Sequence, residues 1–198
     1  MEIFTRQTEL IRILDLIGYY RFPQISKFSQ YKNLPNDVKE KYQTDFEKLT
    51  PLVEIYSFSI MQDHYHLLIR QLVEDGIKTF TSNFQNAYAK YFNTKKARYG
   101  SVFSNPFKAK WIENDEIFLH VSRYIHLNPV TSFIIKVDEL SDHPWTSYPI
   151  YVGKNTGTFI NTELLLGIAG SAPKYRKFVE NQVDYQRKLH QIKKSLFD

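Results

Sequence analysis

The chain has 198 residues, a formal net charge of +5 and no cysteine. This length suits one domain with or without an appended piece, and 42% apolar residues suffice for a folded core, which excludes wholesale disorder. The lack of cysteine excludes disulfides, thiolate zinc sites and cysteine nucleophiles. We find neither a signal peptide nor an apolar run of membrane-helix length, so we expect a cytoplasmic protein with no membrane partner.

The first half of the chain predicts two helices followed by a hairpin. Apolar residues recur at helical spacing over residues 8–20, and residues 36–49 predict a second, more exposed helix. Alternating β-forming residues predict a strand over residues 53–60. A short turn at residues 61–63 leads into a second strand over residues 64–70, which completes the hairpin.

An aromatic stripe predicts the next helix. Residues 77–93 place large apolar side chains on one helical face, and we expect most of that face to pack in the core. After a basic loop region, residues 107–112 alternate in a way that indicates a further strand.

The last part of the chain is predicted to be helical. Asn114 or Asp115 is expected to cap a helix that runs to about Leu127 and that Pro129 stops. The stretch around Trp145 is expected to be a loop. Two terminal helices follow it, of which the last is basic.

Positive charge gathers between residues 77 and 112, where seven Lys or Arg residues occur without a single Asp or Glu. Aromatic residues alternate with these cations, and single-stranded nucleic acids bind cationic grooves that carry aromatic platforms. The alternative is a solvated loop with aromatic side chains buried beneath it. The residues expected to contact DNA are Lys90, Lys95, Lys96, Arg98, Tyr99, Phe103, Lys108 and Lys110.

The second predicted strand carries the triplet His64-Tyr65-His66. Side chains two apart on a strand point to the same face, so both imidazoles can reach one metal ion. A His-x-His pair is a weak signal by itself. The alternative is two histidines on an ordinary half-buried strand.

The predicted helix before Pro129 carries a second candidate group. Tyr124 and Asn128 are four residues apart and share a helical face. A neutral tyrosine hydroxyl is a weak nucleophile, and a nearby cation that polarises a phosphodiester oxygen lowers the barrier to its attack. If this helix packs on the hairpin, Tyr124 and Asn128 lie beside the two histidines. The alternative is a tyrosine that serves only the core.

Taken together, these segments resemble the HUH single-tyrosine transposases, and among them the REP-associated tyrosine transposases. Order and spacing agree over about residues 53–153, and the combination is far more specific than any one motif. The matching segments are residues 60–69 with the two histidines, 88–100 with Val102-Phe103, 123–130 with the tyrosine, and 144–148.

The resemblance implies an α+β fold of the ferredoxin-like HUH type, with a central antiparallel sheet flanked by helices. We assign it to residues 1–153 and expect a helical C-terminal extension over residues 154–198. The resemblance makes His64 and His66 metal ligands, Asn128 the polar residue that completes the metal site, and Tyr124 the nucleophile that bonds to a 5′ phosphate.

The resemblance also implies a divalent cofactor and a DNA partner. Its metal is magnesium or manganese, whereas imidazole ligands by themselves favour manganese or zinc, so the ion stays open. The expected partner is single-stranded or hairpin DNA, bound by a monomer or a homodimer.

Three features depart from the family's pattern. Relatives begin with a strand before the segment that resembles residues 3–4 onwards, so we expect that strand to be missing and a sheet edge to be exposed. Asn105-Pro106 stands where relatives carry a Gly-Arg pair, which removes an expected phosphate contact. Gln62-Asp63 replaces the more usual Pro-Asn before the first histidine.

The main hypothesis is therefore a transposase that cleaves and rejoins single-stranded DNA through a covalent phosphotyrosine. One rival is a non-catalytic nucleic-acid-binding relative, decayed or repurposed, which the missing strand favours. Another is a metal-dependent nuclease that works without a covalent intermediate. The joint presence of His64, His66, Tyr124 and Asn128 favours the enzyme over the binder.

Overall fold

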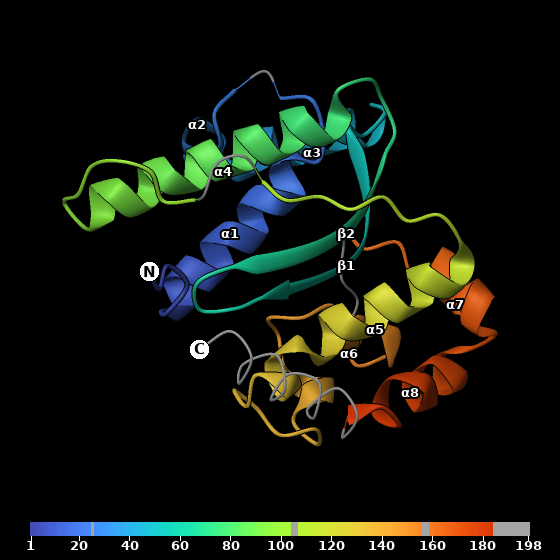
Figure 1. Cartoon of the computed structure of the whole chain (residues 1–198). Coiled ribbons are helices and arrows are strands. Elements are labelled where there is room, and N and C mark those ends of the chain that lie inside the picture. The colour runs from blue at the N-terminus through green and yellow to red at the C-terminus, as the bar shows by residue number, and fades with distance from the viewer. Residues whose placement is uncertain (25, 104–106, 156–158, 184–198) are drawn as a thin grey trace. The chain divides into compact units, whose positions relative to one another are not determined.

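The computed structural model describes residues 1–24, 26–103, 107–155 and 159–183 (Figure 1). They form two compact units. The first combines Met1–Glu54 with Arg70–Lys108, and the second combines Ile55–Ile69 with the described residues from Ala109 onwards. The expected α+β class is confirmed, because helices accompany an antiparallel sheet that has two strands in the described part of the chain.

The hairpin matches its prediction closely. Strand β1 spans Val53–Ile60 and strand β2 spans Tyr65–Gln71. The backbone N–H of Met61 donates to the carbonyl oxygen of His64 at 2.9 Å and closes the turn. Short segments cover the other edge of β1, where Ser59 pairs with Thr146 and Ile55 pairs with Ile160. Pairing of this kind satisfies backbone groups that an open edge would expose.

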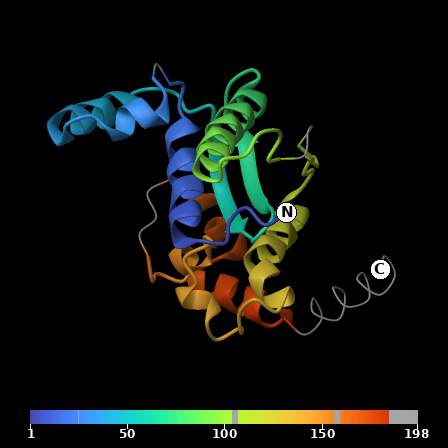
Figure 2. The ribbon, with the colours of Figure 1, turned by 90° about the vertical axis from the view of Figure 1, so that its left-hand side faces the viewer.

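The first unit holds four helices: α1 (Gln7–Tyr20), α2 (Phe28–Lys32), α3 (Asn36–Glu47) and α4 (Gly76–Lys95). Helix α1 packs against α4 (Figure 2). Three of the four helices were predicted, and α2 was missed because five residues are too few to show a period.

The aromatic stripe of α4 packs in the core, as expected. Phe80, Phe84, Tyr88 and Phe92 are all buried. The hydroxyl of Tyr88 donates to the carbonyl oxygen of Ile3, which ties the N-terminal segment to the helix.

The second unit contains α5 (Asp115–Thr131), the 3₁₀ helix η1 (Leu140–Asp142), α6 (Tyr148–Tyr151), α7 (Glu163–Ala169) and α8 (Ala172–Glu180). Asn114 caps α5, because its side-chain oxygen accepts from the backbone N–H of Ile117 at 2.9 Å. The two helices predicted near the C-terminus are confirmed as α7 and α8. The remainder of the predicted basic extension, residues 184–198, lies outside the described residues, as does Asn105-Pro106.

The predicted stop at Pro129 is wrong, because α5 continues through the proline to Thr131. Proline removes one helical hydrogen bond, but buried neighbours outweigh that loss here. Leu127 and Val130, on either side of the proline, are both completely buried in the core. Tertiary packing therefore overrides the local signal.

The predicted strand over residues 107–112 is also wrong, because this segment is irregular. A strand forms when one face of the alternating pattern is buried. The aromatic residues of the segment do not supply such a face: Trp111 is 89% exposed and Phe107 is 36% exposed.

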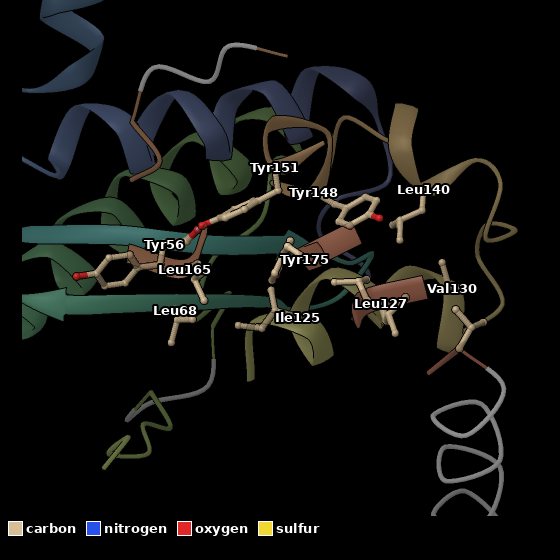
Figure 3. Close-up of a cluster of buried hydrophobic side chains, with 12 residues drawn as sticks. Tyr56, Leu68, Ile125, Leu127, Val130, Leu140, Tyr148, Tyr151, Leu165 and Tyr175 are labelled. Atoms are coloured by element: carbon tan, nitrogen blue, oxygen red, sulfur yellow. The ribbon is translucent and has the colours of Figure 1, made fainter. Parts of the chain in front are cut away.

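The core of the second unit joins β1, β2 and helices α5 to α8 (Figure 3). Tyr56 of β1 also meets Phe118 of α5 edge to face, with ring centroids 4.9 Å apart. The buried cluster consists of Tyr56, Leu68, Ile125, Leu127, Val130, Leu140, Tyr148, Tyr151, Leu165, Tyr175, Val179 and Val183.

A chain of polar groups crosses this core and is centred on His126, which is completely buried. Its Nε2 lies 2.7 Å from Oγ of Ser147, and its Nδ1 lies 2.8 Å from the hydroxyl of Tyr175. Oγ of Ser147 accepts from the backbone N–H of Phe58 at 2.9 Å. At the other end, the hydroxyl of Tyr175 lies 2.9 Å from Oγ of Ser122.

One set of proton positions satisfies every member of this chain. The hydroxyl of Ser122 donates to the carbonyl oxygen of Leu119 at 2.8 Å, so Ser122 accepts from Tyr175. Tyr175 then accepts from Nδ1–H of His126, and the bare Nε2 accepts from Ser147. With Nδ1 protonated and Nε2 bare the imidazole is neutral, which agrees with the lowered pKa of the buried His126, and the chain connects β1, α5 and α8.

We expect the stability of the protein to fall in acid because of His126. Burial lowers the pKa of His126 to about 3 in the folded protein, below its unfolded value of about 6.5. The stabilisation is therefore fully present above pH 6.5 and is lost as the pH falls towards 3. Each pH unit in this window costs on the order of 1.4 kcal/mol.

Urea unfolding of the wild type and of His126→Gln at several pH values measures this contribution. The variant should be less stable at pH 7, but its stability should decline less steeply between pH 6.5 and 4, because glutamine does not titrate. Equal slopes for the two proteins would show that His126 is not the titrating group.

Candidate active site

The two histidines of the His-x-His pair lie at the start of β2 and face one another. The ring centroids of His64 and His66 are 5.0 Å apart with the rings nearly perpendicular. The His64 side chain is 48% exposed, whereas the His66 side chain is half-buried. The predicted proximity of the two imidazoles is thus present in the structure.

Asp63 orients the first of these rings. Its Oδ1 lies 2.6 Å from Nδ1 of His64. This hydrogen bond is the main cause of the lowered pKa of the Asp63 carboxyl. A carboxylate that accepts from Nδ1–H fixes the tautomer and leaves Nε2 with its lone pair available to a ligand.

His66 is held in its neutral form. Burial, with a smaller contribution from the neighbouring His64, lowers the pKa of His66 to about 4. At neutral pH its imidazole is therefore uncharged and retains a lone pair, which is the state that binds metals.

Tyr124 projects from α5 towards His66. The two ring centroids are 5.6 Å apart and the rings meet edge to face. Tyr124 is 45% exposed although its neighbours Ile125 and His126 are buried. Among the described residues we find no hydrogen bond to its hydroxyl, and its partly exposed ring lies beside the imidazole of His66.

Asn128 lies one turn beyond Tyr124 and is almost completely buried. Its backbone oxygen accepts from the N–H of Ser132 and from Oγ1 of Thr131, at 3.0 and 3.1 Å. In the described part of the chain, its amide makes no hydrogen bond to either histidine. The structure thus brings His64, His66 and Tyr124 together, and it places Asn128 on the same helix as the tyrosine.

The donor set suits a single divalent cation with open positions. Metal sites commonly include two imidazole ligands, with a carboxylate that orients one of the rings. No cluster of three or more His, Cys, Asp or Glu side chains able to hold a metal occurs in the residues that the structure describes. The remaining ligands would therefore be the amide of Asn128, water or substrate oxygens.

Two of the predicted DNA-binding cations also stabilise the first unit. Nζ of Lys95 and Nζ of Lys96 lie 3.3 and 3.5 Å from the carboxylate of Glu9, which is completely buried. The same carboxylate accepts from the backbone N–H of Thr5 and of Arg6 at 3.2 and 3.0 Å. Burial opposes ionisation of Glu9, but these hydrogen bonds and cations together lower its pKa.

The other predicted DNA contacts differ in exposure. Tyr99 is 95% exposed, and Lys90 and Lys108 are exposed in the same unit. Arg98 is half-buried, with its guanidinium 3.3 Å from the carbonyl oxygen of Ser101.

Phe103 and Lys110 differ from these residues in their surroundings. Phe103 packs against Phe4 and Tyr88, with centroids 6.3 and 5.8 Å apart, which favours a core role for this ring. Lys110 is exposed and belongs to the second unit.

Sequence reasoning missed the residues that support the site. Asp63 appeared only as a departure from the family's pattern, although its position directly before His64 could have indicated a hydrogen bond. The role of His126 had no sequence signal, because its partners Ser147 and Tyr175 are 21 and 49 residues away.

The family model described as "Transposase IS200 like" matches residues 26–128, a range that includes both histidines, Tyr124 and Asn128. Neither a curated protein nor a solved structure gives a significant match.

We expect Glu9→Gln to destabilise the protein at neutral pH by about 1–3 kcal/mol, because the buried carboxylate accepts charge-assisted hydrogen bonds. The lowered pKa means that this stabilisation is present above about pH 4.5 and is lost as the pH falls. Urea unfolding should therefore show a larger difference in unfolding free energy between the wild type and Glu9→Gln at pH 7 than at pH 3.5.

The exposed Glu2→Gln is the matched control and should change the unfolding free energy by less than about 0.5 kcal/mol. A Glu9→Gln protein as stable as the control at pH 7 would contradict the structural role of this ion pair.

Proposed function

Because the chain belongs to the family of IS200-like transposases, we propose that it cleaves and rejoins single-stranded DNA through Tyr124. The observation that carries this proposal is the solvent-facing ring of Tyr124 beside His66, whose partner His64 completes a His-x-His pair. A tyrosine that served only the core would be buried, whereas Tyr124 is 45% exposed.

The chemistry follows from the groups present. The hydroxyl oxygen of Tyr124 attacks a phosphodiester phosphorus, and a bond forms between them as the bond to the 3′ oxygen breaks. The phenolic proton is transferred in net to the departing 3′ oxygen. The product is a 5′-phosphotyrosine, which conserves the energy of the broken bond so that a 3′-hydroxyl can later attack and restore the tyrosine.

A divalent cation is the proposed cofactor, with magnesium or manganese as the expected ion. His64 and His66 would hold it, with Asn128 as the third protein ligand. The cation supplies charge neutralisation and polarisation of the phosphodiester. Two features of the chain prepare the histidine pair to bind a cation: Asp63 orients the ring of His64, and burial keeps His66 neutral.

The proposed substrate is a single strand, presented alone or beside a hairpin. Tyr99, which is 95% exposed, offers a stacking surface in the same unit as exposed cations such as Lys90 and Lys108. Exposed aromatic rings among cations bind unpaired bases without strong sequence preference.

We expect a covalent protein–DNA adduct when the protein is mixed with labelled single-stranded hairpin DNA and manganese. Denaturing gel electrophoresis should show a shifted band that resists denaturant and requires the metal. The Tyr124→Phe protein should lack this band and bind the DNA within about twofold of the wild type, since phenylalanine retains the ring and loses only the hydroxyl.

Tyr99→Phe is the matched control and should still form the adduct. DNA binding without any adduct in the wild type would support the non-catalytic relative instead. Cleavage that survives in Tyr124→Phe would support a metal-dependent nuclease without a covalent intermediate.

We also expect His64→Ala and His66→Ala each to weaken manganese binding by roughly 10-fold or more, because each removes one imidazole ligand. Titration calorimetry of the DNA-free protein measures this directly. His143→Ala, outside the candidate site, is the control and should leave the affinity unchanged. Equal affinities in all four proteins would place the metal elsewhere.

A further inference from the structure

The first unit contains a groove of about 660 Å³ that the proposed chemistry does not use. Residues of α1, of α4 and of the segment 27–29 line it, and α1 and α4 pack side by side (Figure 2). Sites for small ligands have volumes of about 300–1,000 Å³, so this groove can hold a compact organic molecule.

The lining is cationic. Among the described residues, four basic residues (Arg12, Lys27, Lys90 and Lys95) and no acidic residue line the groove. Lys95 is paired with Glu9, whereas we find no ion pair for the other three within the described ranges. Such a lining favours an anionic ligand.

Arg12 is held in a fixed orientation at this groove. Its guanidinium carbon lies 5.1 Å from the ring centroid of Phe28 and 4.7 Å from that of Tyr91. Contacts with both rings restrain the guanidinium, and among the described residues we find no hydrogen bond from its N–H groups. A guanidinium fixed in this way suits a phosphate, which accepts two parallel hydrogen bonds.

The groove also offers groups that match a planar base. Three aromatic rings line the groove: Tyr20 and Phe28 are almost completely buried, whereas Tyr91 is half-buried and is the most exposed of the three. Asn83 and Asn86, three residues apart on α4, both line the groove. Each amide can donate and accept, as the edge of a nucleobase requires.

We propose that this groove binds one nucleotide unit, with its phosphate at Arg12 and its base against the aromatic side chains, within reach of Asn83 and Asn86. The proposal deepens the proposed function and rests on it for the choice of a nucleotide as the ligand. A planar base uses the aromatic surface and the amides together, which favours a nucleotide over an acidic peptide. The nucleotide can be part of a DNA strand or free in solution.

Titration calorimetry on the metal-free Tyr124→Phe protein tests this proposal without any covalent step. The probes are the four deoxynucleoside 5′-monophosphates, a single-stranded tetranucleotide, inorganic phosphate and an acidic hexapeptide. We expect at least one mononucleotide or the tetranucleotide to bind more tightly than phosphate and than the peptide.

Arg12→Gln should weaken nucleotide binding by about 10-fold or more, since it removes a charge-assisted contact. Asn83→Ala should change the ranking of the four bases. Lys78→Gln, which alters an α4 cation outside the groove, should change affinity by less than about 2-fold. Thermal unfolding of each variant shows whether it is folded. If Arg12→Gln does not fold, Asn83→Ala still tests the site.

The site is supported if these variants weaken the binding of both the mononucleotides and the tetranucleotide. If they weaken the binding of the tetranucleotide alone, the site is supported and the bound nucleotide belongs to a DNA strand. The proposal would be overturned if neither nucleotide probe bound, or if phosphate bound as tightly as the mononucleotides. It would also be overturned if the peptide bound more tightly than the nucleotides, or if neither Arg12→Gln nor Asn83→Ala changed the nucleotide affinities. The readout needs neither metal nor the Tyr124 hydroxyl, so its failure is distinguishable from failure of the adduct assay.

Discussion

The candidate site depends on the buried hydrogen-bond chain through His126. That imidazole connects Ser147, which accepts from the β1 backbone, with Tyr175 of α8, and it belongs to the same helix as Tyr124. A buried polar chain of this kind is stabilising only when every member has its partner, so it specifies one position of α5 relative to the hairpin. His66 and Tyr124 occupy neighbouring positions because the hairpin and the helix meet in that single arrangement.

The two units carry different chemistry. The second unit holds the imidazole pair and the tyrosine, and burial lowers the pKa of His66, so that this imidazole is neutral at pH 7. The first unit holds most of the predicted DNA contacts and the cationic groove at Arg12. It also holds the buried carboxylate of Glu9, which forms ion pairs with Lys95 and Lys96. Two of the predicted DNA-binding cations, Lys95 and Lys96, therefore also have a structural role as partners of Glu9.

Local patterns predicted much of the fold and singled out the His-x-His pair and Tyr124, whose proposed roles come from the family resemblance. The strand over residues 53–60 and the long aromatic helix were predicted because alternation and helical spacing are local properties. Pro129 misled the prediction because its cost is offset by buried neighbours that only the tertiary structure provides. Residues 107–112 alternate in sequence but bury no face. The partners of His126 and Glu9 are up to 87 residues away, a separation at which no local pattern gives a signal.

Mass-spectrometric mapping of the covalent linkage tests the role of Tyr124 most directly. The protein is reacted with hairpin DNA and manganese, digested with nuclease and protease, and searched for a peptide that carries a nucleotide. We predict that the nucleotide is attached to Tyr124 through a 5′ phosphate. Attachment to another of the 14 tyrosines, such as the exposed Tyr99, would contradict the proposed chemistry.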